Sequence, residues 1–425
     1  MLSQMMLFQM SLPQTVRRTL ILLQLACLAP SLGSAYSVLT HEAIIDSIWD
    51  TTLKPILLLR FPNSTPDQLR EAHAYAYGGS IIQDMGYYPF GSKFFSDLVH
   101  YTRSGDFVVA MIQDAQDLNE FAFALGALEH YFADTTGHPE GVNRVVPMLY
   151  PKLERKYGNV VTYEDKPSAH LKTEFGFDVL EVARGNYAPE SYHDFIGFKV
   201  SKPLLERAFQ DTYSLPLTDV FKDLDLALGS YRRTVSSLLP KMTKVAWAAK
   251  KDDIRKVHPG ITERKFRYNL SKAAYEKEWS RDYEKPGIGA RILAFFFKLV
   301  PKVGPFQALG FKMPTPQGET VFMKSFDDTL ARAKSVTLEV KTDKLQLPNL
   351  DFDTGNPTRQ GEYRLADDTY NKLLDLYADK HIVPSDAMRT NIIAFFQEPT
   401  LVRDSKAYTE LSDLRSNLKP VSAAH

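Results

Sequence analysis

Apolar residues recur at steps of three and four positions along most of the chain, which is the period of an amphipathic α-helix. Helices are predicted over residues 41–59, 66–83, 105–134, 173–184, 216–251, 263–282, 319–336 and 367–379. Strand signals are weak, because only residues 335–340 form a β-rich run and that run follows directly on a predicted helix. The pattern therefore predicts an all-α fold.

The pattern changes near Lys341. From there to Asp367 the chain is polar and interrupted by prolines and glycines, which is typical of a long loop, and two final helices are expected after it. We therefore divide the chain into residues 1–35, an all-α domain over 36–340, and a loop with a C-terminal helical extension over 341–425.

An apolar run at residues 292–300 contains three consecutive phenylalanines, with Arg291, Lys298 and Lys302 around it. A buried helix and an element that dips into a lipid interface would both have this composition. The sequence leaves both interpretations open.

The first 35 residues are organised as a secretory signal. Arg17 and Arg18 form the positive start, residues 20–29 the apolar core, and residues 33–35 a small-residue cleavage site. The apolar run is too short to span a bilayer. We expect a secreted or periplasmic protein that is cut near Ala35 and has no transmembrane anchor.

The only cysteine of the chain, Cys27, lies inside this apolar run and would be removed with it. A lipoprotein anchored at Cys27 is the alternative, but Gln24 stands where a lipoprotein signal normally has an aliphatic residue. Export with cleavage near Ala35 would leave a chain without thiols or disulfides.

The overall charge sets no strong requirement for a partner. Basic and acidic residues number 51 each, and loss of Arg17 and Arg18 leaves 49 basic residues against 51 acidic ones. A nearly neutral chain does not need a polyanion, so nucleic acid is a less favoured ligand. The remaining length of about 390 residues is enough for a large core or two domains.

Candidate metal ligands are concentrated in the first half of the chain. Imidazole and carboxylate groups are the ligands that zinc takes when no thiolate is present. Eight such groups stand out: His41, Asp84, His100, His130, Asp134, His138, His170 and Glu174. One tetrahedral zinc takes three or four protein ligands, so this set suffices for two or three ions, as in many phosphate-ester hydrolases.

The spacing of these residues supports shared sites. His130 and Asp134 are four residues apart in a predicted helix, so their side chains lie on the same helical face. Gly137 and Pro139 are expected to end that helix and to let His138 turn toward a neighbouring ion. His170 and Glu174 repeat the four-residue spacing in a second helix.

In this order and spacing, the residues resemble the superfamily of zinc-dependent phospholipases C and single-strand nucleases. The resemblance extends from residue 36 to about 180 and rests on these segments: Tyr36-Ser-Val-Leu-Thr-His41, Asp84 with Met85-Gly-Tyr-Tyr-Pro89, His100, Leu125-Gly-Ala-Leu-Glu-His130-Tyr-Phe-Ala-Asp134, and His170 to Glu174. It implies an all-α domain that holds three zinc ions.

The resemblance also implies a role for each residue. The first ion would be bound by Asp84, His100, His130 and Asp134, and the second by His138, His170 and Glu174. The third would be bound by His41 and by the amino nitrogen and carbonyl oxygen of the mature first residue, Tyr36, with Asp134 bridging it to the first ion. Because that amino group exists only after cleavage, export would complete the site.

Two departures from the family pattern stand out. Tyr36 replaces the usual tryptophan, which is tolerable because the ligand atoms belong to the backbone. The best-known members have two more residues between the equivalents of Asp134 and His138, and Glu140 or Asn143 could replace or support His138. A further histidine, His73, is interpreted as a core or supporting residue.

The resemblance implies hydrolysis of a phosphate ester, with Asp84 as the candidate general base. A phospholipase C acting on phospholipid at a membrane surface is the preferred function, and aromatic residues between Asp84 and His100 would either face a cationic headgroup or pack between helices. These aromatics are Tyr87, Tyr88, Phe90, Phe94 and Phe95. The alternatives are a single-strand nuclease or phosphatase of the same superfamily, and a non-catalytic protein stabilised by zinc.

Overall fold

The computed structural model describes residues 37–184, 198–235, 247, 250–256, 259–263, 310–337, 339–342, 345–396, 409 and 411–414. Regular structure in these ranges is helical, and the only strand-like feature there is an isolated bridge between Leu350 and Pro357. The predicted all-α fold is therefore confirmed. Tyr36, the signal segment, nearly all of the helix predicted at 263–282 and the apolar run at 292–300 lie outside the described residues.

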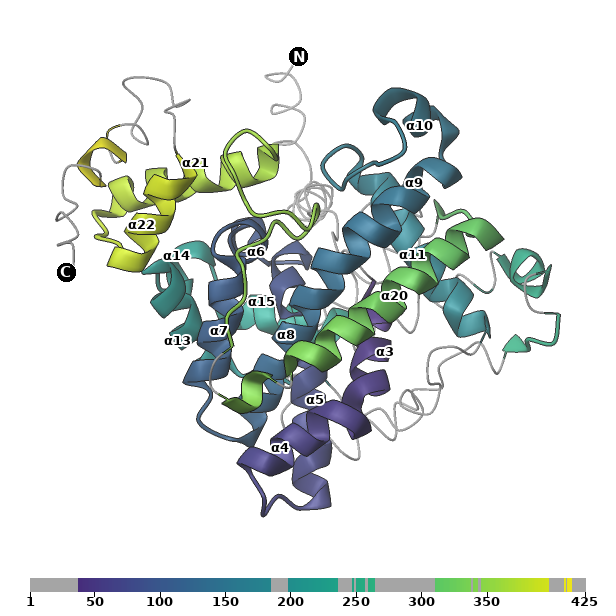
Figure 1. The fold of residues 1–425 in the computed structure, drawn as a ribbon, viewed down its shortest axis with the longest axis horizontal. Coiled ribbons are helices and arrows are strands. Elements are labelled where there is room, and N and C mark those ends of the chain that lie inside the picture. The colour runs from purple at the N-terminus through teal and green to yellow at the C-terminus, as the bar shows by residue number, and fades with distance from the viewer. Residues whose placement is uncertain are drawn as a thin grey trace, which may run out of the picture.

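A single helix, α8 (Leu118–Gly137), forms the centre of the molecule, and almost all of its 20 residues are buried. It packs against α5 (Pro66–Gly79), α7 (Ser104–Asp114), α3 (Val38–Ile48) and α20 (Pro316–Thr337). Figure 1 shows α20 crossing the molecule beside α8 and α3. The predicted ligands therefore lie on and around the most buried helix that the structure describes.

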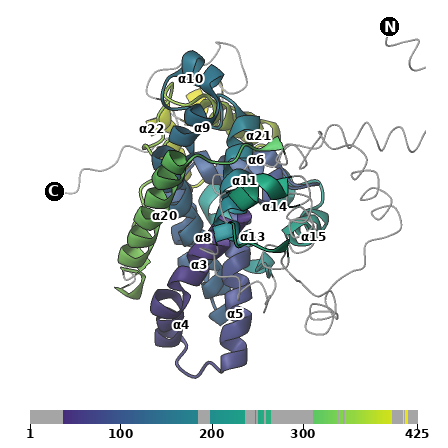
Figure 2. The same cartoon turned by 90° about the vertical axis from the view of Figure 1, so that its right-hand side faces the viewer.

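The other helices complete this arrangement. α3 continues through a π-helical turn (Trp49–Leu53) into α4 (Lys54–Arg60), which projects together with α5 at one end of the molecule (Figure 2). The remaining helices are α6 (Lys93–Tyr101), α9 (Asn143–Leu149), α10 (Pro151–Tyr157), α11 (Pro167–Arg184), α13 (Lys202–Tyr213), α14 (Leu217–Val220), α15 (Leu224–Arg233), α21 (Arg364–Lys380) and α22 (Asp386–Phe395). Shorter turns are the 3-10 helices at Ile82–Tyr87 and Glu339–Thr342 and a π-helical turn at His138–Val142.

Several predicted helix boundaries are wrong for an identifiable reason. The single helix expected over 105–134 is divided into α7 and α8, because the Asp117 side chain accepts hydrogen bonds from the backbone N–H groups of Asn119 and Glu120 and starts a new helix. Asp223 caps α15 in the same way and interrupts the helix expected over 216–251. The structure also contains α6, α9, α10, α13 and α22, whose bounds the pattern did not define.

The strand signal at residues 335–340 is wrong. α20 extends to Thr337, and Glu339–Thr342 forms a 3-10 helix. The β-branched residues of this run are compatible with helix when packing favours it, since intrinsic propensity is a weak signal. The long loop predicted after Lys341 is confirmed over residues 345–363, and α21 and α22 follow it.

The residues 345–363, hereafter the 345–363 segment, pack onto the central helices. Leu345, Leu347, Leu350 and Phe352 belong to the same hydrophobic cluster as residues of α5, α7 and α8. Figure 1 shows the segment passing from the end of α20 toward α21. None of the helices in the described part of the chain combines the length and the apolar character that a bilayer span requires.

Close contact between α5 and α8 depends on glycine. A Cβ atom at Gly79 would lie 1.9 Å from the Phe123 carbonyl oxygen, and one at Gly126 would lie 2.1 Å from the Ala76 carbonyl oxygen. No side chain fits at these separations, so the two helix backbones touch at this crossing. This approach also brings the end of α5 next to His130 of α8.

Replacement of Gly126 by alanine should therefore force α5 and α8 apart. We expect Gly126→Ala to lower the free energy of unfolding by about 1–3 kcal/mol, the usual effect of overpacking, measured by urea denaturation. Gly229→Ala in α15 is the matched control, because a Cβ atom there meets nothing within 4 Å. The control should be neutral or slightly stabilising; equal effects of the two changes would contradict the close approach.

Candidate metal centre

Four predicted ligands converge from three elements. Asp84 lies in the 3-10 turn after α5, His100 lies near the end of α6, and His130 and Asp134 lie one turn apart on α8. His100 Nε2 is 3.4 Å from Asp84 Oδ1 and 3.5 Å from Asp134 Oδ2. His130 Nε2 is 3.1 Å from the same Asp134 oxygen. All four side chains are buried.

Backbone carbonyls orient the two histidines. His100 Nδ1 lies 2.7 Å from the Ser96 carbonyl oxygen, and His130 Nδ1 lies 2.8 Å from that of Ser80. A carbonyl oxygen only accepts hydrogen bonds, so Nδ1 donates in each case and Nε2 is the nitrogen that faces the carboxylates. This is the usual support of a metal-binding histidine.

The separations of these atoms fit a metal ion. Two ligands bound to zinc at about 2.0–2.2 Å in tetrahedral geometry lie roughly 3.3 to 3.6 Å apart. Two of the three separations above, 3.4 and 3.5 Å, lie in this range, and the third, 3.1 Å, is slightly shorter. Among the described residues, His130 Nε2 and both Asp134 oxygens have no hydrogen-bond partner, although they are buried. Buried polar atoms are seldom left in this state, so the residues fit a shared cation.

His41 lies on the other side of Asp134. It belongs to the first turn of α3, and its ring stacks on that of His130 with the centroids 4.5 Å apart. His41 Nε2 is 3.6 Å from Asp134 Oδ1, and His41 Nδ1 is 3.5 Å from Glu129 Oε2. The two oxygens of Asp134 therefore face different histidines.

The start of α3 is held in place by Asp178, a buried residue of α11. Asp178 accepts hydrogen bonds from the Thr40 hydroxyl at 2.8 Å and from the Leu39 backbone N–H at 3.3 Å. Burial raises the pKa of Asp178 to about 7, although hydrogen bonds from Ser37, Thr40 and Leu39 act in the opposite direction. This carboxyl group fixes the chain immediately after Tyr36, which itself lies outside the described residues.

The remaining three predicted ligands form a second group. His138 lies one turn after Asp134, with Nε2 3.9 Å from Asp134 Oδ2, and its ring stacks on that of His170 at 4.9 Å. His170 contacts Glu174 Oε1 through Nδ1 at 2.5 Å and Asn143 Oδ1 through Nε2 at 2.7 Å. α8 ends at Gly137, as expected, and a π-helical turn begins at His138.

Of the two residues considered as support for His138, only one reaches the group. Asn143 is buried and contacts His170, whereas Glu140 is exposed. His73 lies apart, stacked on Trp49 at 3.8 Å, with Nε2 3.2 Å from Asp46.

Burial and neighbouring charges divide the histidines into two kinds. Burial lowers the pKa of His41 and His170 well below the usual value and lowers that of His138 to about 4. These three rings are neutral near pH 7 and keep a lone pair for a metal. Burial also acts to lower the pKa of His100, but Asp134 and Asp84 outweigh it and raise that pKa to about 10.

Sequence reasoning missed three residues beside this centre. Glu129 precedes His130 and faces His41, a contact that its place in the chain does not reveal. Phe352 lies with its ring centroid 4.8 Å from that of His100 and 5.9 Å from that of His130. Asp353 Oδ1 is 3.5 Å from His138 Nδ1. The one sequence feature that points to Asp353 is the pair of aspartates at 351 and 353 before Gly355. The rest of the segment predicts only a loop.

Most of the aromatic residues between Asp84 and His100 pack between helices. Tyr88 contacts Tyr231, and Phe95 contacts Phe209, each with both rings buried. Tyr87 is also buried and lies 6.1 Å from His100 by ring centroids. Phe90 differs, because 61% of it is exposed and its φ angle is 66°.

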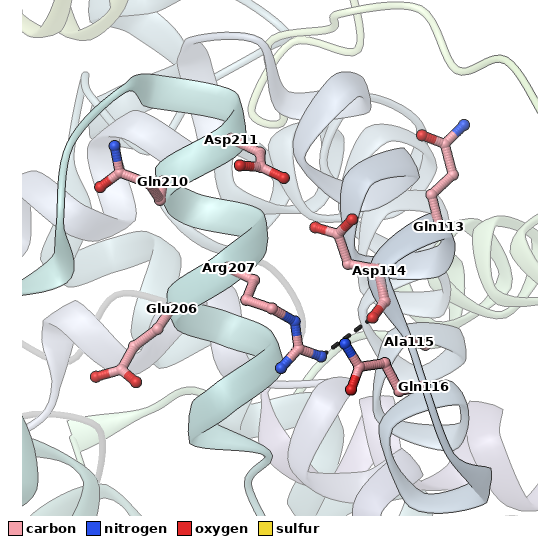
Figure 3. Close-up of a pocket in the computed structure, with 8 residues that line it drawn as sticks. All are labelled: Gln113, Asp114, Ala115, Gln116, Glu206, Arg207, Gln210 and Asp211. Carbon is pink, nitrogen blue, oxygen red and sulfur yellow. Dashed lines mark hydrogen bonds between the residues drawn. The ribbon is translucent and has the colours of Figure 1, made fainter.

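A separate surface hollow of about 600 Å³ lies between the end of α7 and α13. Figure 3 shows its lining, in which Arg207 donates a hydrogen bond to the Asp114 carbonyl oxygen and the Asp211 carboxylate lies nearby. It contains none of the predicted ligands, so its position does not alter the assignment of the centre.

Comparison with known families agrees with this geometry. A family model described as zinc-dependent phospholipase C matches residues 40–223. Residues 40–223 belong to the zinc-dependent phospholipase C family. The protein is accordingly a zinc-dependent phosphoric ester hydrolase. No curated protein and no solved structure shows significant similarity to the chain.

The phospholipase C match contains all eight predicted side-chain ligands, from His41 to Glu174. It ends before α20 and before the 345–363 segment. The contacts of Phe352 and Asp353 with His100, His130 and His138 are therefore made by a part of the chain that the phospholipase C family model does not cover.

The raised pKa of Asp178 predicts how stability depends on pH. The folded-state pKa, about 7, lies above the ordinary value of 3.8, so the folded protein holds the proton more tightly than the unfolded chain does. The stability that this group contributes is fully present below about pH 4 and is lost as the pH rises through 7. A shift of this size corresponds to at most about 4 kcal/mol.

Asp178→Asn removes the ionisable group. Between pH 4 and pH 7, the free energy of unfolding should therefore fall less in this variant than in the wild type, with both proteins zinc-free and unfolded by urea. Asp368→Asn, a change at an exposed residue, should retain the wild-type dependence. Parallel curves for Asp178→Asn and the wild type would refute the prediction.

Proposed function

We propose that the protein is an exported zinc-dependent phospholipase C that hydrolyses phospholipid at a membrane surface with three zinc ions per chain. The observation that supports the cluster most directly is the position of Asp134. Its Oδ2 faces His100 and His130, while its Oδ1 faces His41. A carboxylate in this arrangement is suited to bridge two ions.

The first ion would be held by Asp84, His100, His130 and Asp134, whose ligand atoms have separations that suit tetrahedral zinc. The second would be held by the group that contains His138, His170 and Glu174. Within that group Glu174 Oε2 is buried and has no hydrogen-bond partner among the described residues. The donors are nitrogen and oxygen throughout, as in most catalytic zinc sites.

The third ion would be held by His41 and by the terminal amino nitrogen and carbonyl oxygen of Tyr36. Support comes from the start of α3, because Asp178 anchors Leu39 and Thr40 and the Ser37 carbonyl oxygen accepts hydrogen bonds from the N–H groups of Thr40 and His41. Residue 36 would then lie directly beside the histidine that it is proposed to assist.

Bound zinc would supply an activated water near neutral pH and would neutralise the charge of the phosphate. The protein's own residues would position it. Asp84, which is buried beside His100, is proposed to accept a proton as general base. The closely packed α5 and α8 would hold the ligands rigidly, which favours catalysis over a flexible site.

Loss of one central ligand should abolish most of the activity. We expect His130→Asn to reduce kcat/KM on phosphatidylcholine vesicles by at least a factor of about 100, because removal of even a supporting residue typically reduces metal affinity or activity by about 10 to 100 times. His381→Asn is the matched control: His381 is exposed and has a φ angle of 54°, which asparagine tolerates. The control should retain wild-type activity.

The same assay distinguishes the alternative substrates. Wild-type protein should release phosphocholine from vesicles, and removal of zinc by a chelator should stop this until zinc is restored. Turnover of single-stranded DNA without turnover of lipid would replace the proposed function by a nuclease. Stable zinc without turnover of either substrate would favour a binding protein.

The N-terminus provides a separate test. N-terminal sequencing of the exported protein should find Tyr36 first, and protein beginning at Tyr36 should bind about one zinc ion more per chain than protein with one extra glycine before Tyr36. An α-amino group has a pKa of about 8 and can lose its proton to a metal, whereas an amide nitrogen cannot serve in this way. Equal zinc content, or a lipid-modified Cys27 start, would contradict the third position.

A further inference from the structure

The 345–363 segment lies against the metal centre although it is far from the ligands in the chain. The Tyr131 hydroxyl donates to the Pro348 carbonyl oxygen at 2.8 Å, and the Ser104 hydroxyl donates to that of Leu350 at 2.6 Å. The Phe352 N–H donates to the His100 carbonyl oxygen at 3.3 Å. These contacts hold the segment beside the helices that carry His100 and His130.

Asp353 is a polar side chain that the segment buries in this region, and only 3% of it is exposed. Its Oδ2 accepts hydrogen bonds from the hydroxyl groups of Tyr101, at 2.8 Å, and Tyr363. These two bonds turn the carboxylate so that its other oxygen, Oδ1, faces His138 Nδ1 at 3.5 Å.

This separation is too long for a good hydrogen bond between nitrogen and oxygen, which typically measures about 2.7–3.2 Å. It matches the distance of roughly 3.3 to 3.6 Å between two ligands of one tetrahedral zinc. His138 Nδ1 is buried and has no hydrogen-bond partner among the described residues. We propose that Asp353 is a ligand of the second metal position and shares the ion with Nδ1 of His138.

The surroundings of Asp353 connect it with the rest of the second group. The Asn143 side chain donates from Nδ2 to the Asp353 carbonyl oxygen at 2.7 Å, and its Oδ1 contacts His170 Nε2, also at 2.7 Å. One amide therefore links the backbone of Asp353 to His170. This bridge places Asp353, His138 and His170 around one volume.

The charge of this volume also favours a cation. Asp353 and Glu174 are both buried, and Glu174 Oε2 has no hydrogen-bond partner among the described residues. Buried carboxylates are unfavourable unless a positive charge lies beside them. A divalent ion at the second position would supply this charge.

The local conformation of the segment is suited to bring Asp353 to the site. Asp351 Oδ1 accepts the N–H groups of Asp353 and Thr354, at 2.8 and 3.1 Å, and forms a tight turn. Gly355 follows with a φ angle of 71°, and a Cβ atom there would lie 2.7 Å from the Thr135 carbonyl oxygen. The turn can therefore approach the end of α8, next to His138.

The proposal rests on the proposed function, because it assumes the second zinc position. Its test measures zinc per chain and zinc affinity by competition with a chelator, for the wild type, for Asp353→Asn and for the exposed control Asp368→Asn. We expect Asp353→Asn to bind about one zinc fewer per chain at limiting zinc and to bind it at least about ten times more weakly. The control should match the wild type.

Stability provides a second measurement. Zinc raises the unfolding temperature of a protein that binds it only when folded. Asp353→Asn should show a smaller increase with zinc, while the zinc-free forms of this variant and the wild type should unfold at similar temperatures. If Asp353→Asn does not fold, the double variant Tyr101→Phe/Tyr363→Phe tests the same point, because it keeps the carboxylate and removes the two groups that orient it.

The outcomes separate the two hypotheses. Fewer than two zinc ions in the wild type would overturn the proposed function together with this inference. At least two zinc ions in the wild type, with unchanged zinc content and affinity in Asp353→Asn, would overturn the role of Asp353 alone. If Asp353→Asn does not fold, unchanged zinc affinity in Tyr101→Phe/Tyr363→Phe would likewise overturn the role of Asp353.

Discussion

The buried carboxylate of Asp134 is the group on which the rest of the site depends. Isolated in a protein interior, a carboxylate would be strongly unfavourable, so the surrounding structure must supply positive charge. Burial acts to raise the pKa of Asp134, but the adjacent His130 and His100 side chains hold it well below its usual value. Its Oδ1 faces His41, and its Oδ2 faces His100 and His130. Asp134 therefore connects the first and third proposed metal positions.

The arrangement of the ligands follows from the way the helices pack. Gly79 and Gly126 allow α5 and α8 to touch, and this contact brings the Ser80 carbonyl oxygen within hydrogen-bond distance of His130. Ser96 orients His100 from within its own helix. The Nε2 atoms of both rings therefore face the carboxylates. Stability and site geometry depend on the same helix contacts.

The C-terminal part of the chain extends this centre. The 345–363 segment shares a hydrophobic cluster with the central helices, and through Phe352 and Asp353 it touches three of the histidines. It lies outside the phospholipase C match, which ends at residue 223. A carboxylate contributed from this segment is a feature of this chain that the family comparison does not describe.

The sequence by itself determined the helical class and the eight candidate side-chain ligands, because apolar periodicity and the i, i+4 spacing of ligands act over a few residues. It did not determine where α8 begins, since Asp117 caps it by a contact that apolar spacing does not encode. The weak β-rich signal at 335–340 coincides with the end of α20 and a 3-10 helix. Only the tertiary structure placed Asp353 beside His138 and joined it to Tyr101, a residue 252 positions earlier. Such contacts depend on how distant segments pack together, and no local pattern of residues records that packing.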